Sequence, residues 1–245
     1  MRPFLLLSTR AEDEAAIGEH GAVARFAGLS PDELRHVRVE AAAMPALDLS
    51  DYSGVILGGG PFNSSDPDKS ELQLRVEADL RRVLTEVLAD DLPFLGLCYG
   101  VGTVTTQLGG VVDREFGEPV SAVDIRLTDA GRRDHLLAEL AALPGGFTAF
   151  VGHKEAVSRL PDGAVLLATG TECPVQMFRV GANCYVTQFH PELDGPGIGL
   201  RIQVYKHNGY FRPEETQSLL ATTSAATITP QVHSILRRFA QRYAR

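Results

Sequence analysis

Apolar positions in the first hundred residues alternate between short continuous runs and longer stretches with helical spacing. Residues 71–89 show the clearest helical period, with apolar side chains on one face and most of the charged ones elsewhere. The apolar face carries Val76, Leu80, Val83, Leu84, Val87 and Leu88. A second helix is predicted at 12–27, and short apolar runs predict strands at 4–8, 36–40, 54–57 and 93–97.

This alternation of strand and helix predicts a parallel sheet covered by helices on both faces, which is a three-layer α/β fold. A capping serine, a proline and a glutamate in Ser30-Pro31-Asp32-Glu33 predict that another helix begins there. Further strand candidates follow one another closely at 121–127, 164–169, 174–179 and 184–188. Their close spacing predicts a mixed or antiparallel extension of the sheet.

The sequence changes character near residue 210, so we expect a main domain over residues 1–210 and a C-terminal extension over 211–245. Residues 222–227 are polar and of low complexity, which is typical of a linker. Pro230 then opens an amphipathic segment, whose apolar face carries Val232, Ile235, Leu236 and Phe239. This segment either docks as a helix on the same chain or binds a partner.

The composition is that of a folded globular protein, with 245 residues, 44% of them hydrophobic and 22% charged. A formal net charge of −8 would repel a phosphate backbone, which argues against nucleic acid as a partner. The first apolar run ends at Leu7 and an acidic stretch follows, so we expect no secretory leader. Because nothing approaches the ~20 apolar residues of a membrane helix, we expect a cytoplasmic protein without a membrane segment.

The three cysteines, Cys98, Cys173 and Cys184, form neither a CxxC pair nor a spacing typical of metal ligands. An odd number in a reducing compartment indicates free thiols. A small buried apolar residue is the usual role of each. The sequence therefore predicts no metal and no cofactor, and the surroundings of Cys98 distinguish it from the other two.

Cys98 lies in the pattern G-x-C-x-G, Gly96-Leu97-Cys98-Tyr99-Gly100, directly after the predicted strand 93–97. This is the cysteine form of a nucleophile elbow, a sharp strand-to-helix turn that exposes one side chain above the sheet. The two glycines remove side chains that would clash in the turn. A helix N-terminus favours thiolate over thiol, and the Tyr99 N–H would face an oxyanion on the substrate. The pattern alone also fits a buried, inert cysteine.

A second candidate group lies downstream, where a predicted strand leads into Gln188-Phe189-His190-Pro191-Glu192. A thiol nucleophile needs a base within hydrogen-bond reach, and the base needs a third group that fixes its tautomer. His190 and Glu192 are separated by one rigid proline, which can bring the carboxylate to the imidazole. A structural histidine is the alternative for His190.

The predicted strand at 54–57 ends in Gly58-Gly59-Gly60-Pro61. A glycine N–H in this turn could face the same substrate oxygen as the N–H of Tyr99. A tight turn that leaves a strand would also use glycines. Neither a Walker lysine nor a G-x-G-x-x-G pattern accompanies the turn, so nucleotide binding is rejected.

Together, the motifs at 58–61, 96–100 and 188–192 resemble those of the class I glutamine amidotransferases in order and spacing, and most of all the glutaminase domains of GMP synthases. The resemblance covers residues 4–207 or so, and the string at 188–192 is its most specific part. It implies a doubly wound, flavodoxin-like fold in which Cys98 attacks the side-chain amide of glutamine. His190, held by Glu192, would pass a proton to the departing ammonia and then activate water.

The resemblance also assigns residues that bind the substrate. The N–H groups of Gly60 and Tyr99, with Gly59 in the same turn, would bind the oxyanion. His153 lies where the family has a histidine-containing segment lining the glutamine pocket, and a structural histidine is the alternative. Family members commonly have glutamine four residues after the nucleophile, where this chain has Gly102. We expect its absence to enlarge the pocket and to remove a polar contact worth about 1–3 kcal/mol.

Three functions remain open at this stage. The first is a glutamine amidotransferase or glutaminase that acts alone or with a separate synthetase, because the chain has no motif of an ATP-using synthetase. The second is a hydrolase or transpeptidase of other γ-glutamyl compounds, suggested by Gly102. The third is a catalytically silent binding module. The ammonia acceptor and the oligomeric state are not encoded in any of these patterns.

Overall fold

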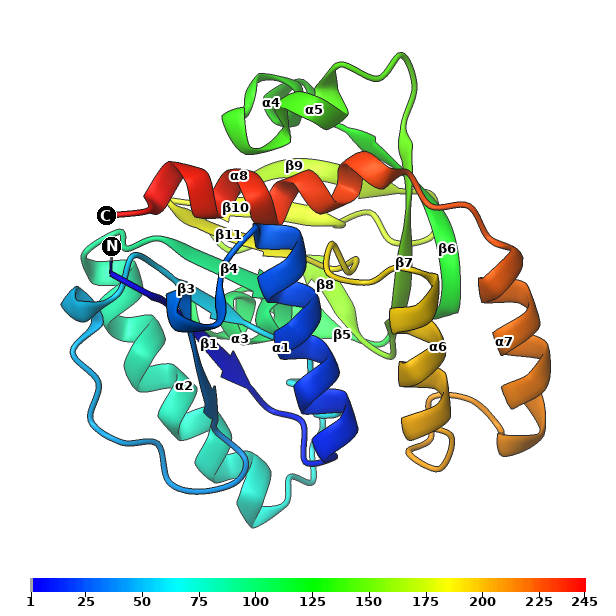
Figure 1. Cartoon of the computed structure of the whole chain (residues 1–245), viewed down its shortest axis with the longest axis horizontal. Coiled ribbons are helices and arrows are strands. Elements are labelled where there is room, and N and C mark those ends of the chain that lie inside the picture. Colours follow the sequence, from blue (N-terminus) through cyan, green and yellow to red (C-terminus); the bar gives the residue numbers. More distant parts are fainter. Residues whose placement is uncertain (1) are drawn as a thin grey trace.

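Within residues 2–245, which the computed structural model describes, a nine-stranded mixed sheet lies between layers of helices (Figure 1). The strands lie in the order β2-β1-β3-β4-β11-β10-β9-β6-β7. The strands from β2 to β11 are parallel to their neighbours, and those from β10 to β7 are antiparallel to theirs. The predicted three-layer α/β fold with an antiparallel extension is confirmed.

The parallel half of the sheet consists of β2 (Leu34–Arg38), β1 (Phe4–Ser8), β3 (Val55–Leu57), β4 (Phe94–Leu97) and β11 (Cys184–Thr187). All of these strands except β2 are buried along their whole length, which explains their continuous apolar runs. The chain adds β2 on one side of β1 and β3 on the other side, so the direction of winding reverses there. Doubly wound sheets bind ligands beside such a reversal, outside the carboxyl ends of the strands.

The helices that cover the parallel strands are α1 (Asp13–Ala27), α2 (Glu71–Ala89), α3 (Tyr99–Gln107) and α8 (Ser234–Tyr243). Phe4 and Leu6 of β1 pack in one hydrophobic cluster with α1 and α8. Leu5 and Leu7 of the same strand pack in a second cluster with α2 and α3. The period-two alternation along β1 therefore separates the two helical layers. None of the helices in the described part of the chain is long and apolar enough to cross a membrane.

The antiparallel half consists of β10 (Met177–Val180), β9 (Val165–Gly170), β6 (Glu118–Leu127) and β7 (Phe147–His153), and a separate pair is formed by β5 (Val111–Asp113) and β8 (Ala156–Arg159). Three further helices flank the antiparallel β6–β7 pair or pack beside it: α4 (Asp129–Arg133), α6 (Gly195–Val204) and α7 (Thr216–Ala225). A short helix, α5 (Ala138–Ala141), follows α4. Figure 1 shows α6 and α7 side by side next to the β6–β7 pair, where Phe150, Leu193, Ile198 and Ile202 form a third cluster.

Three local predictions differ from the structure. The capping signature at Ser30 starts only a single 3-10 turn, Pro31–Glu33, because the chain enters β2 directly afterwards. That strand lies two residues before the predicted 36–40. The predicted linker at 222–227 is wrong for residues 222–225, which end α7. There the hydroxyls of Thr222 and Thr223 donate to the carbonyls of Ser218 and Leu219, which satisfies them within the helix.

The C-terminal amphipathic segment docks on its own chain. Val232, Ile235, Leu236 and Phe239 are fully buried, and Phe239 lies 5.9 Å from Phe4 between ring centroids. Figure 1 shows α8 running across the sheet and ending close to the N-terminus, where the N–H of Arg2 donates to the carbonyl of Arg245. The alternative of a partner-binding helix is wrong for this apolar face, because the core of the same chain already covers it.

Candidate active site

Side chains suited to chemistry gather at the carboxyl edge of the parallel strands, beside the reversal of winding. β1 is followed by Arg10, β3 by the glycine turn 58–60, β4 by Cys98 and β11 by the segment 188–192. A cavity lined by Arg10, Gly60, Cys98 and His190 opens there. The fold thus brings together the three motifs that the sequence analysis identified.

Cys98 lies between β4 and α3 in a strained backbone conformation. Its φ is 51° and its ψ is −88°, a combination that residues with side chains rarely adopt. The Cys98 N–H donates to the carbonyl of Thr187 at 2.7 Å, which holds the turn against β11. A Cβ on Gly96 would lie 3.0 Å from the Cα of Gly100, whereas a Cβ on Gly100 would have its nearest neighbours outside the helix at 3.8 Å. The expected clash is therefore present at Gly96, and the prediction is wrong for Gly100.

His190 and Glu192 follow β11, and both are buried. The Nδ1 atom of His190 lies 2.7 Å from Oε1 of Glu192, so the carboxylate reaches the ring across the proline as predicted. The ring also approaches the thiol: a Cβ placed on Gly59 would lie 3.3 Å from Cε1 of His190 and 3.6 Å from Cβ of Cys98. The three residues therefore converge over the glycine turn that follows β3.

The surroundings of His190 favour its protonated form. Burial by itself lowers the pKa of His190, but the Glu192 carboxylate and the Cys98 sulfur outweigh this effect and raise it to about 10. Burial raises the pKa of Glu192, whereas the imidazole and then Arg201 hold it below its ordinary value. Both shifts describe an imidazolium beside a carboxylate. Such a ring can hold a proton next to a sulfur nucleophile and release it to a leaving group.

A second cavity borders Cys98 and is lined by Gly60, Tyr99, Gly102, Glu155, Gln188 and Tyr210, among others. The N–H of Tyr99 is the first of α3, and such groups have no acceptor within their own helix. The carbonyl of Gly60 accepts the hydroxyl of Tyr210 at 3.0 Å, which fixes the orientation of the glycine turn. The Nε2 atom of Gln188 donates towards the Cys98 sulfur at 3.9 Å. This cavity has the polar surroundings that an acyl group would need.

The space beside Gly102 is occupied. A Cβ at this position would clash with the hydroxyl of Ser64 and lie 3.0 Å from Oε1 of Glu155. The Glu155 carboxylate accepts the backbone N–H groups of Ser64 and Ser65 at 2.6 and 2.7 Å. The expected enlargement of the pocket is therefore wrong, because a carboxylate from the β7–β8 turn fills the space. Sequence reasoning missed Glu155, which lies 53 positions further along the chain.

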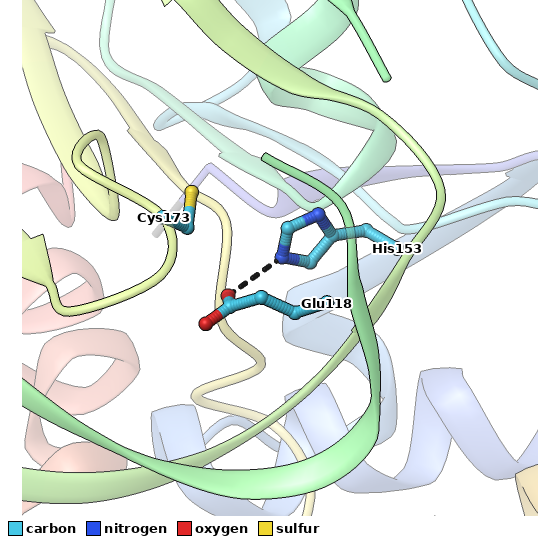
Figure 2. A group of neighbouring side chains, drawn as sticks. All are labelled: Glu118, His153 and Cys173. Carbon is cyan, nitrogen blue, oxygen red and sulfur yellow. Dashed lines mark hydrogen bonds and ion pairs between the residues drawn. The ribbon is translucent and has the colours of Figure 1, made fainter. Parts of the chain in front are cut away.

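His153 also lines the second cavity, but its ring points towards Glu118 and Cys173 (Figure 2). Its Nε2 lies 2.8 Å from Oε2 of Glu118, and its Nδ1 lies 2.9 Å from the carbonyl of Glu155. Both ring nitrogens thus face protein oxygens, and the ring braces the turn that carries Glu155. This geometry favours the structural alternative for His153.

Glu118, His153 and Cys173 could each offer one ligand atom to a metal, since these atoms lie within 4.8 Å of one another. The Oε2 atom of Glu118 already accepts Nε2 of His153 and, at 2.7 Å, Nε2 of Gln176. Burial, followed by the charge of Glu118, raises the pKa of Cys173 to about 12, so the thiol stays protonated. The donor set therefore fits a hydrogen-bonded brace better than a metal centre.

Comparison with known proteins decides the family. Residues 31–199, more than half of the chain, match the family described as glutamine amidotransferase class-I. The chain belongs to this family. Among curated relatives, it is 35% identical over 155 residues to a GMP synthase [glutamine-hydrolyzing] of Ectopseudomonas mendocina, which is 61% of this chain and 27% of the relative. It is 29% identical over 160 residues to the protein of the same name from Petrotoga mobilis, covering 64% and 28%.

The chain thus spans about a quarter of the length of the curated relatives that it matches. Solved structures match almost its full length. A glutamine amidotransferase from Thermotoga maritima has a TM-score of 0.77 at 21% identity, covering 99% of this chain and 98% of that one. A glutamine amidotransferase from Methylobacillus flagellatus has a TM-score of 0.72 at 16% identity, covering 100% and 96%. These two likenesses show the fold.

In this class I glutamine amidotransferase, two buried arginines that the sequence did not single out line the same cavity as Cys98 and His190. Arg10 donates from Nε to Oε1 of Glu19 at 2.8 Å and from Nη1 to the hydroxyl of Tyr205 at 3.1 Å. Arg201 of α6 approaches the same Glu19 oxygen at 3.5 Å. Two sequence signals were available: Arg10 is a charged residue shortly after the buried strand β1, and Arg201 is the one cation in the apolar helix α6. Neither signal shows which residues surround the side chain.

Proposed function

We propose that this protein hydrolyses the side-chain amide of glutamine through a thioester on Cys98, releasing ammonia and glutamate. The proposal rests on one observation: the buried His190–Glu192 pair, 2.7 Å apart, meets the strained nucleophile elbow over the turn at Gly59. Acyl transfer by a thiol requires a base that contacts the cysteine and a carboxylate that contacts and orients the base. These three residues have that arrangement.

Each residue has one task in this reaction. Cys98 gives its proton to His190 and attacks the amide carbon, and the N–H groups of Tyr99 and Gly60 stabilise the oxyanion. The carbon–nitrogen bond breaks as His190 returns the proton to the departing nitrogen. Water then attacks the thioester, gives a proton to His190 and releases the carboxylate, while the proton returns to the sulfur. Glu192 keeps the imidazole oriented throughout and stabilises its positive charge whenever the ring carries the proton.

The same proposal places the protein in the cytoplasm, with residues 1–210 as the catalytic domain and 211–245 as a C-terminal extension. Ammonia would pass to a separate synthetase or be released directly. The free thiols of Cys98, Cys173 and Cys184 support a reducing compartment.

A second candidate function is hydrolysis or transpeptidation of other γ-glutamyl compounds. The observation in its favour is a cavity of about 50 Å³ that borders both Cys98 and His190 and is distinct from the cavity lined by Gly102.

The test is release of glutamate and ammonia from glutamine by purified, reduced protein, compared with Cys98→Ala. We expect at least a 10³-fold loss of rate in the variant, since the nucleophile is removed. Cys184→Ala is the matched control, because this buried thiol lies at the other end of β11 and its variant should retain activity.

A glutaminase that waits for a partner could be silent in this assay, so labelling supplies a second measurement. A glutamine-mimicking diazoketone should add to Cys98 in the wild type and in Cys184→Ala. Protein that neither hydrolyses glutamine nor takes up the label contradicts the proposal and leaves the catalytically silent binding module.

A further inference from the structure

Cys98 lies between two cavities, and only one of them also borders His190. The acyl-side cavity is lined by Gly102, Glu155 and Gln188, together with Tyr99. The other cavity, called here the base-side cavity, is lined by Arg10, His190, Leu193, Ile198, Arg201 and Tyr205, among others. His190 must reach the departing nitrogen to protonate it. A leaving group larger than ammonia would therefore lie in the base-side cavity.

The base-side cavity combines apolar walls with cationic groups. Val151, Leu193 and Ile198 supply apolar surface from β7, the loop after β11 and α6. Arg10 and Arg201 supply two guanidinium groups, and both residues are more than nine-tenths buried. This combination fits a ligand that carries an apolar group and an anion.

Arg201 has donor capacity left over. Its Nη2 makes one long contact, 3.5 Å to Glu19, and its Nη1 is buried without a hydrogen-bond partner among residues 2–245. A buried charged donor without an acceptor is costly, so an anionic ligand that accepts from it would be stabilised. Arg10 differs, because Glu19 and Tyr205 satisfy its Nε and Nη1. Burial, followed by the nearby charge of Arg10, lowers the pKa of Arg201, and the carboxylates of Glu19 and Glu192 only partly oppose this effect.

We propose that the base-side cavity binds the carboxylate of an amino-acid leaving group at Arg201, so that the substrate is a γ-glutamyl amide of an apolar amino acid. The proposal rests on the proposed Cys98 thioester chemistry and narrows its substrate. Arg201 and Arg10 hold the α-carboxylate, and the apolar walls receive the side chain. Glutamine would still fit, with this cavity left to solvent.

The chemistry is balanced as for glutamine. Cys98 forms the thioester with the γ-glutamyl carbonyl while the bond to the amino-acid nitrogen breaks. His190 returns the thiol proton to this nitrogen, so a neutral amine leaves. Water completes hydrolysis, or the amine of a second amino acid held in the same cavity accepts the γ-glutamyl group.

The test compares γ-glutamyl-leucine with γ-glutamyl-isopentylamide, which has the same apolar group and lacks the carboxylate. We expect wild-type kcat/KM to favour the acid by at least tenfold, and Arg201→Met to bring the ratio close to one. A ratio close to one in the wild type overturns the inference. So does an Arg201→Met variant that loses both activities equally, which would make Arg201 a positioning residue for Glu192, whose Oε2 also lacks a partner among the described residues.

Two further measurements keep the outcomes separate. If turnover needs a partner, the kcat/KM comparison is replaced by a protection assay, in which each compound competes with labelling of Cys98 by the diazoketone. γ-Glutamyl-leucine should then protect Cys98 at a lower concentration than the isopentylamide does. If Arg201→Met does not fold, Arg201→Lys replaces it. The lysine ammonium cannot bind a carboxylate through two parallel donors as a guanidinium does, so the preference for the acid over the amide should fall. Glutamine hydrolysis without a preference for the acid contradicts this inference and leaves the proposed function intact. An inactive protein whose Cys98 takes up no label contradicts both the inference and the proposed function.

Discussion

In the proposed reaction His190 carries a proton, and its two neighbours set the pKa of its ring. The Glu192 carboxylate and the Cys98 sulfur raise its pKa to about 10 against the opposing effect of burial. Because the pKa is raised, the imidazolium persists from low pH until the pH approaches this value, and the proton for the leaving nitrogen is available throughout. Above it, the ring is neutral and protonation of the leaving group becomes limiting.

Replacing Glu192 by glutamine tests this assignment. Glu192→Gln removes the main cause that raises the pKa of His190, so the alkaline limb of kcat/KM should move to lower pH, and the maximal rate should fall by about 10²–10⁴-fold. The measurement is the pH–rate profile of wild type and variant with the same substrate. An alkaline limb that stays in place in the variant would show that His190 does not titrate there.

The residues of the candidate site fall into two groups: those that a local sequence motif predicts, and those whose contacts depend on residues far away along the chain. Cys98, His190 and Glu192 could be predicted because each motif carries its own local reason: an elbow, a base and a carboxylate two positions away. Glu155 and Arg201 could not be predicted. Glu155 lies beside Gly102 and Ser64, and Arg201 contacts Glu19, which lies 182 positions earlier in the chain. Only the tertiary arrangement gives these side chains a role.

At the scale of elements, the elbow between β4 and α3 depends unequally on its two glycines. A Cβ on Gly96 would lie 3.0 Å from the Cα of Gly100 and equally close to the side chains of Phe94 and Val186. Gly100 has ordinary contact distances outside its helix.

We therefore expect Gly96→Ala to lower the free energy of unfolding by about 1–3 kcal/mol, because overpacking forces the strand and helix apart. It should also lower activity through displacement of Cys98. Gly100→Ala is the matched variant and should be neutral or slightly stabilising, since alanine is the better helix former. Urea denaturation and glutamine hydrolysis measure both effects, and equal behaviour of the two variants would refute the asymmetry.

Helices and strands whose apolar residues repeat with a clear period could be predicted from the sequence. Those that form because of tertiary packing could not. α2 was predicted residue for residue at 71–89, because its apolar face repeats at helical spacing. α6 was missed, since its first turn reads Gly-Pro-Gly and its glycines are poor helix formers. β7 was missed as well, although it is paired with β6 along most of its length. Residues 128–146, which include α4 and α5, separate the two strands, so their pairing leaves no local sequence pattern.

At the scale of the whole molecule, the last helix is part of the main core. α8 shares a hydrophobic cluster with β1 and α1, so the two ends of the chain stabilise each other. The division near residue 210 remains a proposal about organisation along the chain, and this packing argues that residues 234–243 do not fold separately from β1.

Phe239→Ala should accordingly lower the free energy of unfolding by about 3–5 kcal/mol. The side chain is fully buried, and the cavity left behind would lie between the sheet and α1. Denaturation of the full chain measures the effect, with exposed Gln241→Ala on the same helix as the control. A loss below 1 kcal/mol would mean that the helix is peripheral to the core.

The position of β11 also governs how the protein can be made. β1 to β4 are complete once residue 97 has been synthesised, but the open edge of β4 is covered only when β11 leaves the ribosome much later. An exposed apolar strand edge invites association with other chains. His190 and Glu192 follow β11 directly, so the event that closes this edge also delivers the base and its carboxylate. A chain that ends before β11 therefore lacks both the finished sheet and two of the three residues of the candidate site.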